Sequence, residues 1–197
     1  MIINVKKNKE NLIVDITEAK YMTFIPHLDG YFKCVTLLID KIDKDEDNTL
    51  IYPLLFSFSQ YMELWIKFIV LSINDSSDLI KKLKSHQVKR ILDDSIKKYE
   101  YLFTDYNIDK NLLIELSNQY DYFNNFIKHN KSLSESARFP FDNKGESIII
   151  NYKKIDELSD SGYDSLKHNI IRILEITSQI NKNLIGSLIN KVEIQNK

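Results

Sequence analysis

Residues that break regular structure are scarce in this chain, whose 197 residues include 3 prolines, 4 glycines and a single cysteine. One cysteine excludes an intramolecular disulfide, which fits a reducing compartment such as the cytoplasm. Cys34 lies in the apolar run FKCVTLLI, where a small core residue is expected rather than a nucleophile. The length is sufficient for one domain with its own hydrophobic core.

Strong net charge and the common site motifs are also absent. The net charge of −1 excludes a uniformly basic or acidic chain. No phosphate-binding glycine loop, zinc-spaced Cys/His set or G-x-S-x-G turn occurs, so we expect no cofactor and no metal. Charge is uneven locally: residues 40–48 are acidic, and a basic run supplies candidate nucleic-acid contacts or plain solvated surface, namely Lys81, Lys82, Lys84, Lys89 and Arg90.

Only residues 50–73 form an apolar stretch of membrane-span length, and the N-terminus lacks the apolar segment of a signal peptide. The stretch contains Gln60, Glu63 and Lys67, and a charge near the centre of a span costs roughly 2.5–3.5 kcal/mol. A buried helix is the better interpretation. We expect a soluble, cytoplasmic protein without a membrane partner.

Apolar spacing predicts a mainly α fold: a single domain of residues 1–197 with a few short peripheral strands. Residues 1–25 contain two strand-like runs, IINV and LIVDI, and residues 28–197 are expected to form a helical bundle. Pro26 and Gly30 interrupt the pattern before the first helix. Helices are predicted at 31–42, 50–73, 79–83, 86–103 and 109–128, a strand at 147–152, and a last helix, or two linked pieces, from Asp156 or Ser159.

Three polar residues on the apolar helix 50–73 share one narrow stripe. Gln60, Glu63 and Lys67 follow i, i+3, i+7 spacing, and Glu63 precedes Lys67 by four residues, the favourable order for an ion pair. The stripe either faces solvent or turns inward. If it turns inward, Glu63 needs a cationic or hydrogen-bonding partner, because an unpaired buried carboxylate is costly.

Two histidines are candidate proton-transfer groups. His86 follows Ser85 at a predicted helix start, so it is either a capping or packing residue or an acid–base group. His168 and Arg172 lie four apart on the last predicted helix. They form either an exposed polar pair or a pair for RNA cleavage, in which imidazole moves a proton and guanidinium stabilises the phosphorane.

Three fragments, in this order, resemble the HEPN-like helical superfamily. YMELWIKFIV is similar to its E-x-x-x-K helix, SHQVKRIL to its G-H-D/N-L-x-x-L segment, and ARFPFDNKG to the F-R-Y-P-x-D-x-x-G turn of uncharacterised bacterial members. The resemblance covers roughly residues 50 to 180. In this chain Ser85 replaces the glycine, Gln87-Val88 replaces the acid/amide-leucine pair, and Phe139 replaces the tyrosine.

The resemblance implies a HEPN-like bundle, a homodimer, and a bacterial defence or toxin–antitoxin setting. It also implies that Glu63, Lys67, His86 and Arg138 converge, with the Pro140–Gly145 turn directing Arg138 at a buried Glu63. Catalytic members carry R-x4-6-H on the last helix. This chain lacks that motif, because no histidine lies four to seven residues after any of its arginines, Arg90, Arg138 and Arg172.

Three functions follow as hypotheses. The first is a non-catalytic module that dimerises and binds a protein or a nucleic acid. The second is a divergent metal-independent endoribonuclease that uses His86 or His168 with an arginine. The third gives the predicted cluster of Glu63, Lys67, His86 and Arg138 a purely structural role. Whether the chain is an enzyme stays open at this point.

Overall fold

Long helices dominate the computed structural model, which describes residues 5–8, 11–14, 24–45, 48–73, 88–98, 100–129 and 160–195. The predicted mainly α fold is confirmed. Two short strands, β1 (Val5–Asn8) and β2 (Asn11–Val14), pair antiparallel with Val5 opposite Val14. The predicted helix 79–83 and strand 147–152 lie outside the described residues. The helices are α1 (Phe24–Asp45), α2 (Ile51–Ile73), α4 (Val88–Lys98), α5 (Glu100–Asp105), α6 (Lys110–His129) and α9 (Asp160–Gln195).

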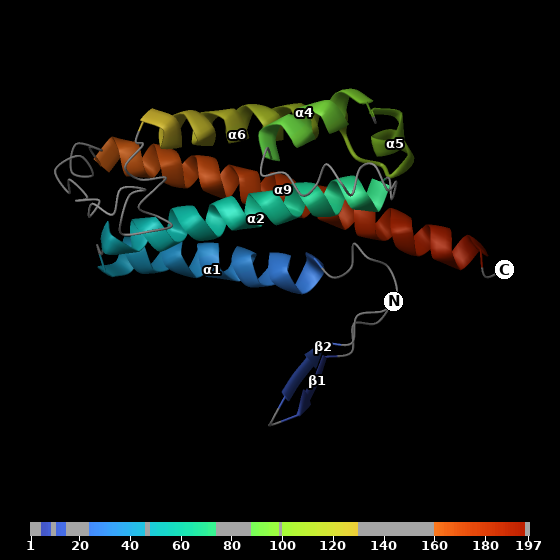
Figure 1. The fold of residues 1–197 in the computed structure, drawn as a ribbon, viewed down its shortest axis with the longest axis horizontal. Helices are drawn as coiled ribbons and strands as arrows, with labels where there is room; N and C mark the ends of the chain where they lie inside the picture. The colour runs from blue at the N-terminus through green and yellow to red at the C-terminus, as the bar shows by residue number, and fades with distance from the viewer. Residues whose placement is uncertain are drawn as a thin grey trace, which may run out of the picture.

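The helices lie side by side around a shared core (Figure 1). Helices α1 and α2 form an antiparallel pair, and α9 lies next to α2. Helices α4 and α6 pack on the side of α2 and α9 that faces away from α1. Helices α6 and α9 run in opposite directions. The hydrophobic core of the bundle contains side chains from every described α-helix.

Helix α1 begins earlier than the sequence predicts. It starts at Phe24, so Pro26 occupies the first turn, where its missing N–H costs no hydrogen bond. Gly30 lies inside the helix, and nothing lies within 4 Å of the Cβ that an alanine would place there. The prediction that these two residues interrupt the chain before the helix is therefore wrong. Cys34 is half-buried, with its Sγ 3.4 Å from Ser57 Oγ on α2.

Helix α2 is the central element of the core. The short 3-10 turn η2 (Asn48–Leu50) leads directly into it, and Pro53 falls in its first turn. Its large side chains are almost completely buried, among them Phe58, Met62 and Trp65. Within the described residues, Ile51–Ser72 is the one stretch long and apolar enough to cross a membrane, but 67% of it is buried inside the bundle. That burial is expected of a core helix.

The region predicted as one helix from 86 to 103 contains two, α4 and α5, either side of position 99. The connection from α5 to α6 turns at Asn107, which has a φ of 54°, a conformation that asparagine tolerates well. Asp109 then caps α6 as predicted: its Oδ1 accepts a hydrogen bond from the backbone N–H of Asn111 at 2.8 Å.

Helix α9 is one uninterrupted helix of 36 residues, not two linked pieces. At 1.5 Å per residue it is about 54 Å long. Its predicted apolar stripe is buried, as Ile170, Ile173 and Leu184 illustrate. Lys167 ties its first turns to α1 through Asp43 at 3.2 Å, and Ser187 near its other end donates to the backbone carbonyl of Tyr106. The long helix thus joins both ends of the bundle.

Candidate functional site

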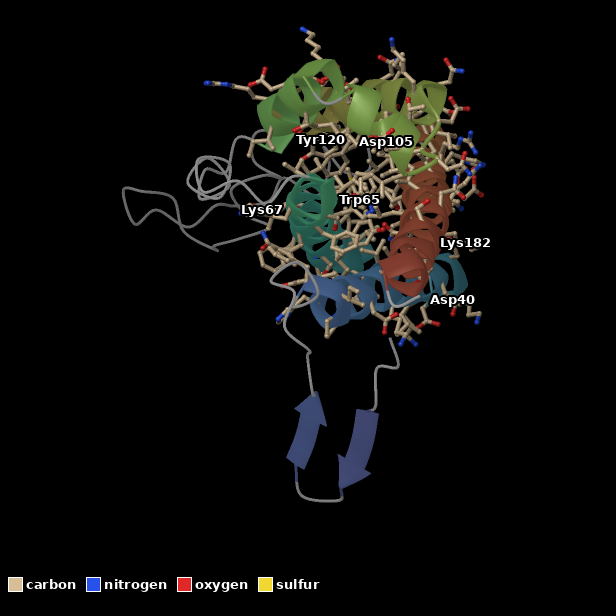
Figure 2. The ribbon with its side chains drawn as sticks, turned by 90° about the vertical axis from the view of Figure 1, so that its right-hand side faces the viewer. Asp40, Trp65, Lys67, Asp105, Tyr120 and Lys182 are labelled. Carbon is tan, nitrogen blue, oxygen red and sulfur yellow. The ribbon has the colours of Figure 1, made fainter. Side chains whose placement is uncertain are left out.

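Glu63 and Lys67 on α2 form a largely buried ion pair. Lys67 Nζ lies 2.6 Å from Glu63 Oε1, and the two side chains are only 15% and 12% exposed. The solvent-facing interpretation of this stripe is therefore wrong for Glu63, and Gln60 is half-buried. Burial raises the pKa of Tyr120 on α6, and the Glu63 charge raises it further. Figure 2 places Lys67 on the side of α2 that faces away from α9.

Several predicted site residues lie outside the described part of the chain. These are Lys81, Lys82, Lys84, His86 and Arg138, and Lys89 is described only as backbone within α4. The pairing of Glu63 with Arg138 therefore stays a prediction. Of the basic run, the side chain of Arg90 is described: it is exposed, with its Nε 3.8 Å from Asp94 Oδ2.

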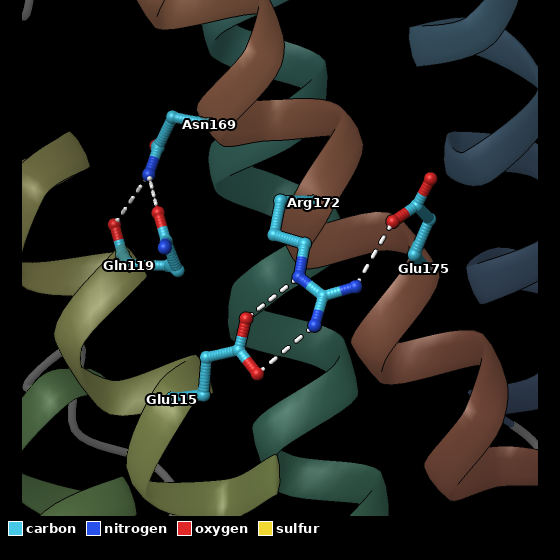
Figure 3. A network of polar contacts seen from close by, with 5 residues as sticks. All are labelled: Glu115, Gln119, Asn169, Arg172 and Glu175. Atoms are coloured by element: carbon cyan, nitrogen blue, oxygen red, sulfur yellow. Dashed lines mark hydrogen bonds and ion pairs between the residues drawn. The ribbon is translucent and has the colours of Figure 1, made fainter.

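The most developed polar cluster in the described residues joins α6 to α9 (Figure 3). Arg172 donates from Nε and Nη2 to the two carboxylate oxygens of Glu115, at 2.6 and 3.0 Å, and from Nη1 to Glu175 at 3.2 Å. This is the two-pronged geometry that guanidinium and carboxylate favour. The hydrogen bonds from Arg172 hold the pKa of Glu115 below its ordinary value. Glu115 raises that of Arg172 in return.

One turn before Arg172, an amide pair extends the same contact. Asn169 Nδ2 donates to the backbone carbonyl of Gln119 at 3.0 Å and to its Oε1 at 2.7 Å (Figure 3). Asn169 is 5% exposed, and its Oδ1 has no hydrogen-bond partner in the described structure. The helices α6 and α9 are therefore joined here by polar contacts as well as by their apolar stripes.

A shallow depression of about 560 Å³ lies over this cluster, and we call it the α6–α9 depression. His168 lines it together with Arg172, so the structure brings this predicted pair to one surface. His168 Nδ1 lies 2.7 Å from the backbone carbonyl of Asp164, which fixes the proton on Nδ1 when the ring is neutral. Tyr122 and Ile171 also line it and are 46% and 37% exposed.

This arrangement limits the chemistry available to the pair. Arg172 can stabilise a phosphorane only if its guanidinium is free to contact the phosphate, and two carboxylates already contact it. His168 retains an unprotonated Nε2 in that tautomer, which could accept a proton or a hydrogen bond. No group of three or more potential metal ligands is found among the described residues.

Sequence reasoning missed Glu115, Gln119 and Asn169. Glu115 precedes Arg172 by 57 residues and Gln119 precedes Asn169 by 50, so no local spacing connects them. Asn169 carries a weak signal: it lies three residues after Leu166 and four before Ile173, so it shares a helix face with two positions of the apolar stripe.

No family model, no curated protein and no solved structure matches this chain. The HEPN-like resemblance therefore stays a prediction.

Proposed function

We propose that this chain is a non-catalytic, HEPN-like helical module that forms a homodimer in the cytoplasm and binds a partner protein. The observation that carries the proposal is the state of Arg172, whose charge is offset by Glu115 and Glu175. A His/Arg ribonuclease needs that cation for the phosphate. The missing R-x4-6-H motif supports the same conclusion. The dimer and the defence or toxin–antitoxin setting rest on the sequence resemblance.

A protein partner fits the α6–α9 depression better than a nucleic acid does. Nucleic-acid binding depends on cations that can replace the counterions of phosphates. In the depression, Arg172 is already paired with Glu115 and Glu175. The depression also exposes an aromatic residue, Tyr122, and an aliphatic residue, Ile171. Aromatic and aliphatic groups surrounded by paired polar groups are typical of protein interfaces. The basic run at residues 81–90 is the feature that favours RNA instead.

Catalysis is tested by incubating the purified protein with a mixture of structured and unstructured RNAs in EDTA. We expect the RNAs to remain intact, with the His86→Ala and His168→Ala variants indistinguishable from wild type. Cleavage by wild type that is lost in one folded histidine variant would overturn the non-catalytic proposal. A filter-binding assay across salt concentrations checks RNA binding: tight binding that weakens steeply with salt would replace the protein partner with RNA.

Partner binding is tested with a photo-crosslinking amino acid placed at Tyr122, in cells that naturally make the protein. Leu37 is the matched control, because it is 67% exposed on α1 rather than on α6. We expect a discrete protein adduct from position 122 and none from position 37. Equal adducts from both positions, or none from either, would contradict a partner at the α6–α9 depression.

A further inference from the structure

A separate cavity of about 270 Å³ lies between α1, α2 and α9. Its walls are mainly apolar and include Leu28, Phe68 and Ile185. Two polar side chains of α9, Ser178 and Asn181, line it as well, and Asp29 is at its α1 side. Ligand sites typically combine apolar walls with a few fixed polar groups, in volumes of roughly 300–1,000 Å³. This cavity has that composition, and its volume lies just below that range.

Trp65 fixes the orientation of the Asn181 amide. The indole Nε1, which can only donate, lies 2.9 Å from Asn181 Oδ1, and Trp65 is completely buried. The oxygen end of the amide therefore faces the indole, and the two donors on Nδ2 are directed elsewhere. No described residue accepts a hydrogen bond from Nδ2. Figure 2 shows Trp65 between α2 and α9.

The neighbouring aromatic contact holds this wall in place. Thr177 donates its hydroxyl proton to the backbone carbonyls of Ile173 and Leu174, at 2.9 and 3.0 Å. Tyr61 O–H must therefore donate to Thr177 Oγ1, 2.7 Å away. Two aromatic side chains of α2, Tyr61 and Trp65, thus reach α9 one turn apart, and each ends in a buried or partly buried hydrogen bond. Two hydrogen bonds from α2 therefore hold the part of α9 that carries Asn181.

The charges around the cavity select against an anion. Asp29 is paired with Lys33 at 2.6 Å, and both side chains are more than half exposed. Among the described residues that line the cavity there is no lysine or arginine, and the one charged group is the Asp29 carboxylate. A neutral hydrogen-bond acceptor suits Asn181 Nδ2 better than a carboxylate ligand does.

We propose that this cavity binds a small neutral molecule with an apolar body and one carbonyl group, whose oxygen accepts a hydrogen bond from Asn181 Nδ2. Ser178 supplies a second polar contact at the same wall, and Leu28 and Phe68 surround the apolar body. The cavity and the α6–α9 depression share no lining residue, although α9 contributes to both.

Phenylacetamide is a suitable probe, because it joins an aromatic ring to a neutral amide. The chain has a single tryptophan, so its ¹H–¹⁵N spectrum contains one indole signal, which reports directly on Trp65 beside Asn181. We expect a saturable shift of that signal with phenylacetamide, and binding at least about tenfold weaker with phenylacetate. A tenfold difference corresponds to about 1.4 kcal/mol.

Two variants and a control locate the probe. Asn181→Asp keeps an oxygen for Trp65 but removes the Nδ2 donors, and Ser178→Leu adds volume at the cavity wall while keeping both groups of the Trp65–Asn181 hydrogen bond. Each should weaken phenylacetamide binding at least about tenfold, whereas Lys182→Ala, on the exposed face of α9, should not change it. Thermal melting confirms that each variant is folded. The proposal is overturned if wild type shows no saturable shift, if phenylacetate binds equally well, or if both folded variants bind like wild type.

Discussion

The buried hydrogen bond between Tyr61 and Thr177 provides a quantitative test of how α2 and α9 are held together. The two oxygens are 2.7 Å apart, and the residues are 2% and 0% exposed. Tyr61→Phe removes the donor but leaves Thr177 bonded to its own helix. We expect a loss of about 1 kcal/mol in the free energy of unfolding, the net value of one ordinary hydrogen bond.

Thr177→Val has a larger expected effect, although it preserves the shape of the side chain. It leaves the Tyr61 hydroxyl buried without an acceptor, which costs roughly 1–3 kcal/mol in addition to the lost bond. The double variant Tyr61→Phe/Thr177→Val removes both polar groups together. It should therefore be more stable than Thr177→Val alone, with a coupling energy of about 1–2 kcal/mol.

Urea denaturation, followed by the fluorescence of buried Trp65, measures all four proteins of this double-mutant cycle. Thr36→Val is the matched control, because Thr36 is exposed on α1 and bonds to the backbone carbonyl of Phe32. It should change stability by no more than about 0.5 kcal/mol. If the two core substitutions are additive within about 0.3 kcal/mol, the hydroxyl contact does not couple α2 to α9.

The helices with long apolar stripes could be predicted from the sequence, because burial on one face imposes a period of 3.6 residues. Helices α2, α6 and α9 confirm this, and Asp109 marked the start of α6. The start of α1 was misjudged because Pro26 and Gly30 usually break helices. A proline in the first turn loses no bond, and a glycine in a helix costs only about 1 kcal/mol. Packing on α2 outweighs that cost.

The candidate site was predictable only in part, for a different physical reason. The shared helix face of His168 and Arg172 follows from their spacing alone, but the charge state of that face depends on Glu115, 57 residues earlier. Trp65 and Asn181 are separated by 116 residues. Such contacts depend on which helices become neighbours. Hydrophobic periodicity predicts which face of each helix is buried, but it does not predict which other helix packs against that face. Glu63 was ambiguous because an i, i+4 ion pair looks the same in sequence whether exposed or buried.

Three further perturbations test the electrostatics. If the Arg138 guanidinium also pairs with the buried Glu63, Arg138→Ala should lower the free energy of unfolding in urea by about 1.5–3 kcal/mol, the range for hydrogen bonds to a charged group, because Lys67 still neutralises the carboxylate. Unchanged stability with a lost function would instead make the turn a site. Stability should also fall as the pH rises from 10 towards 12, because burial raises the pKa of Tyr61 to about 12 and the folded state then keeps a proton that the unfolded chain loses. Tyr61→Phe should reduce this slope. Finally, Arg172→Gln should cost no more than about 1 kcal/mol at neutral pH, because the Glu115 pair is partly exposed. Arg172 holds the pKa of Glu115 below its ordinary 4.5, so this contribution is present above pH 4.5 and is lost as the pH falls below it. Wild type and Arg172→Gln should therefore converge in melting temperature at acidic pH, and a constant difference from pH 7 to pH 3 would show that Arg172 does not stabilise the fold through the Glu115 charge.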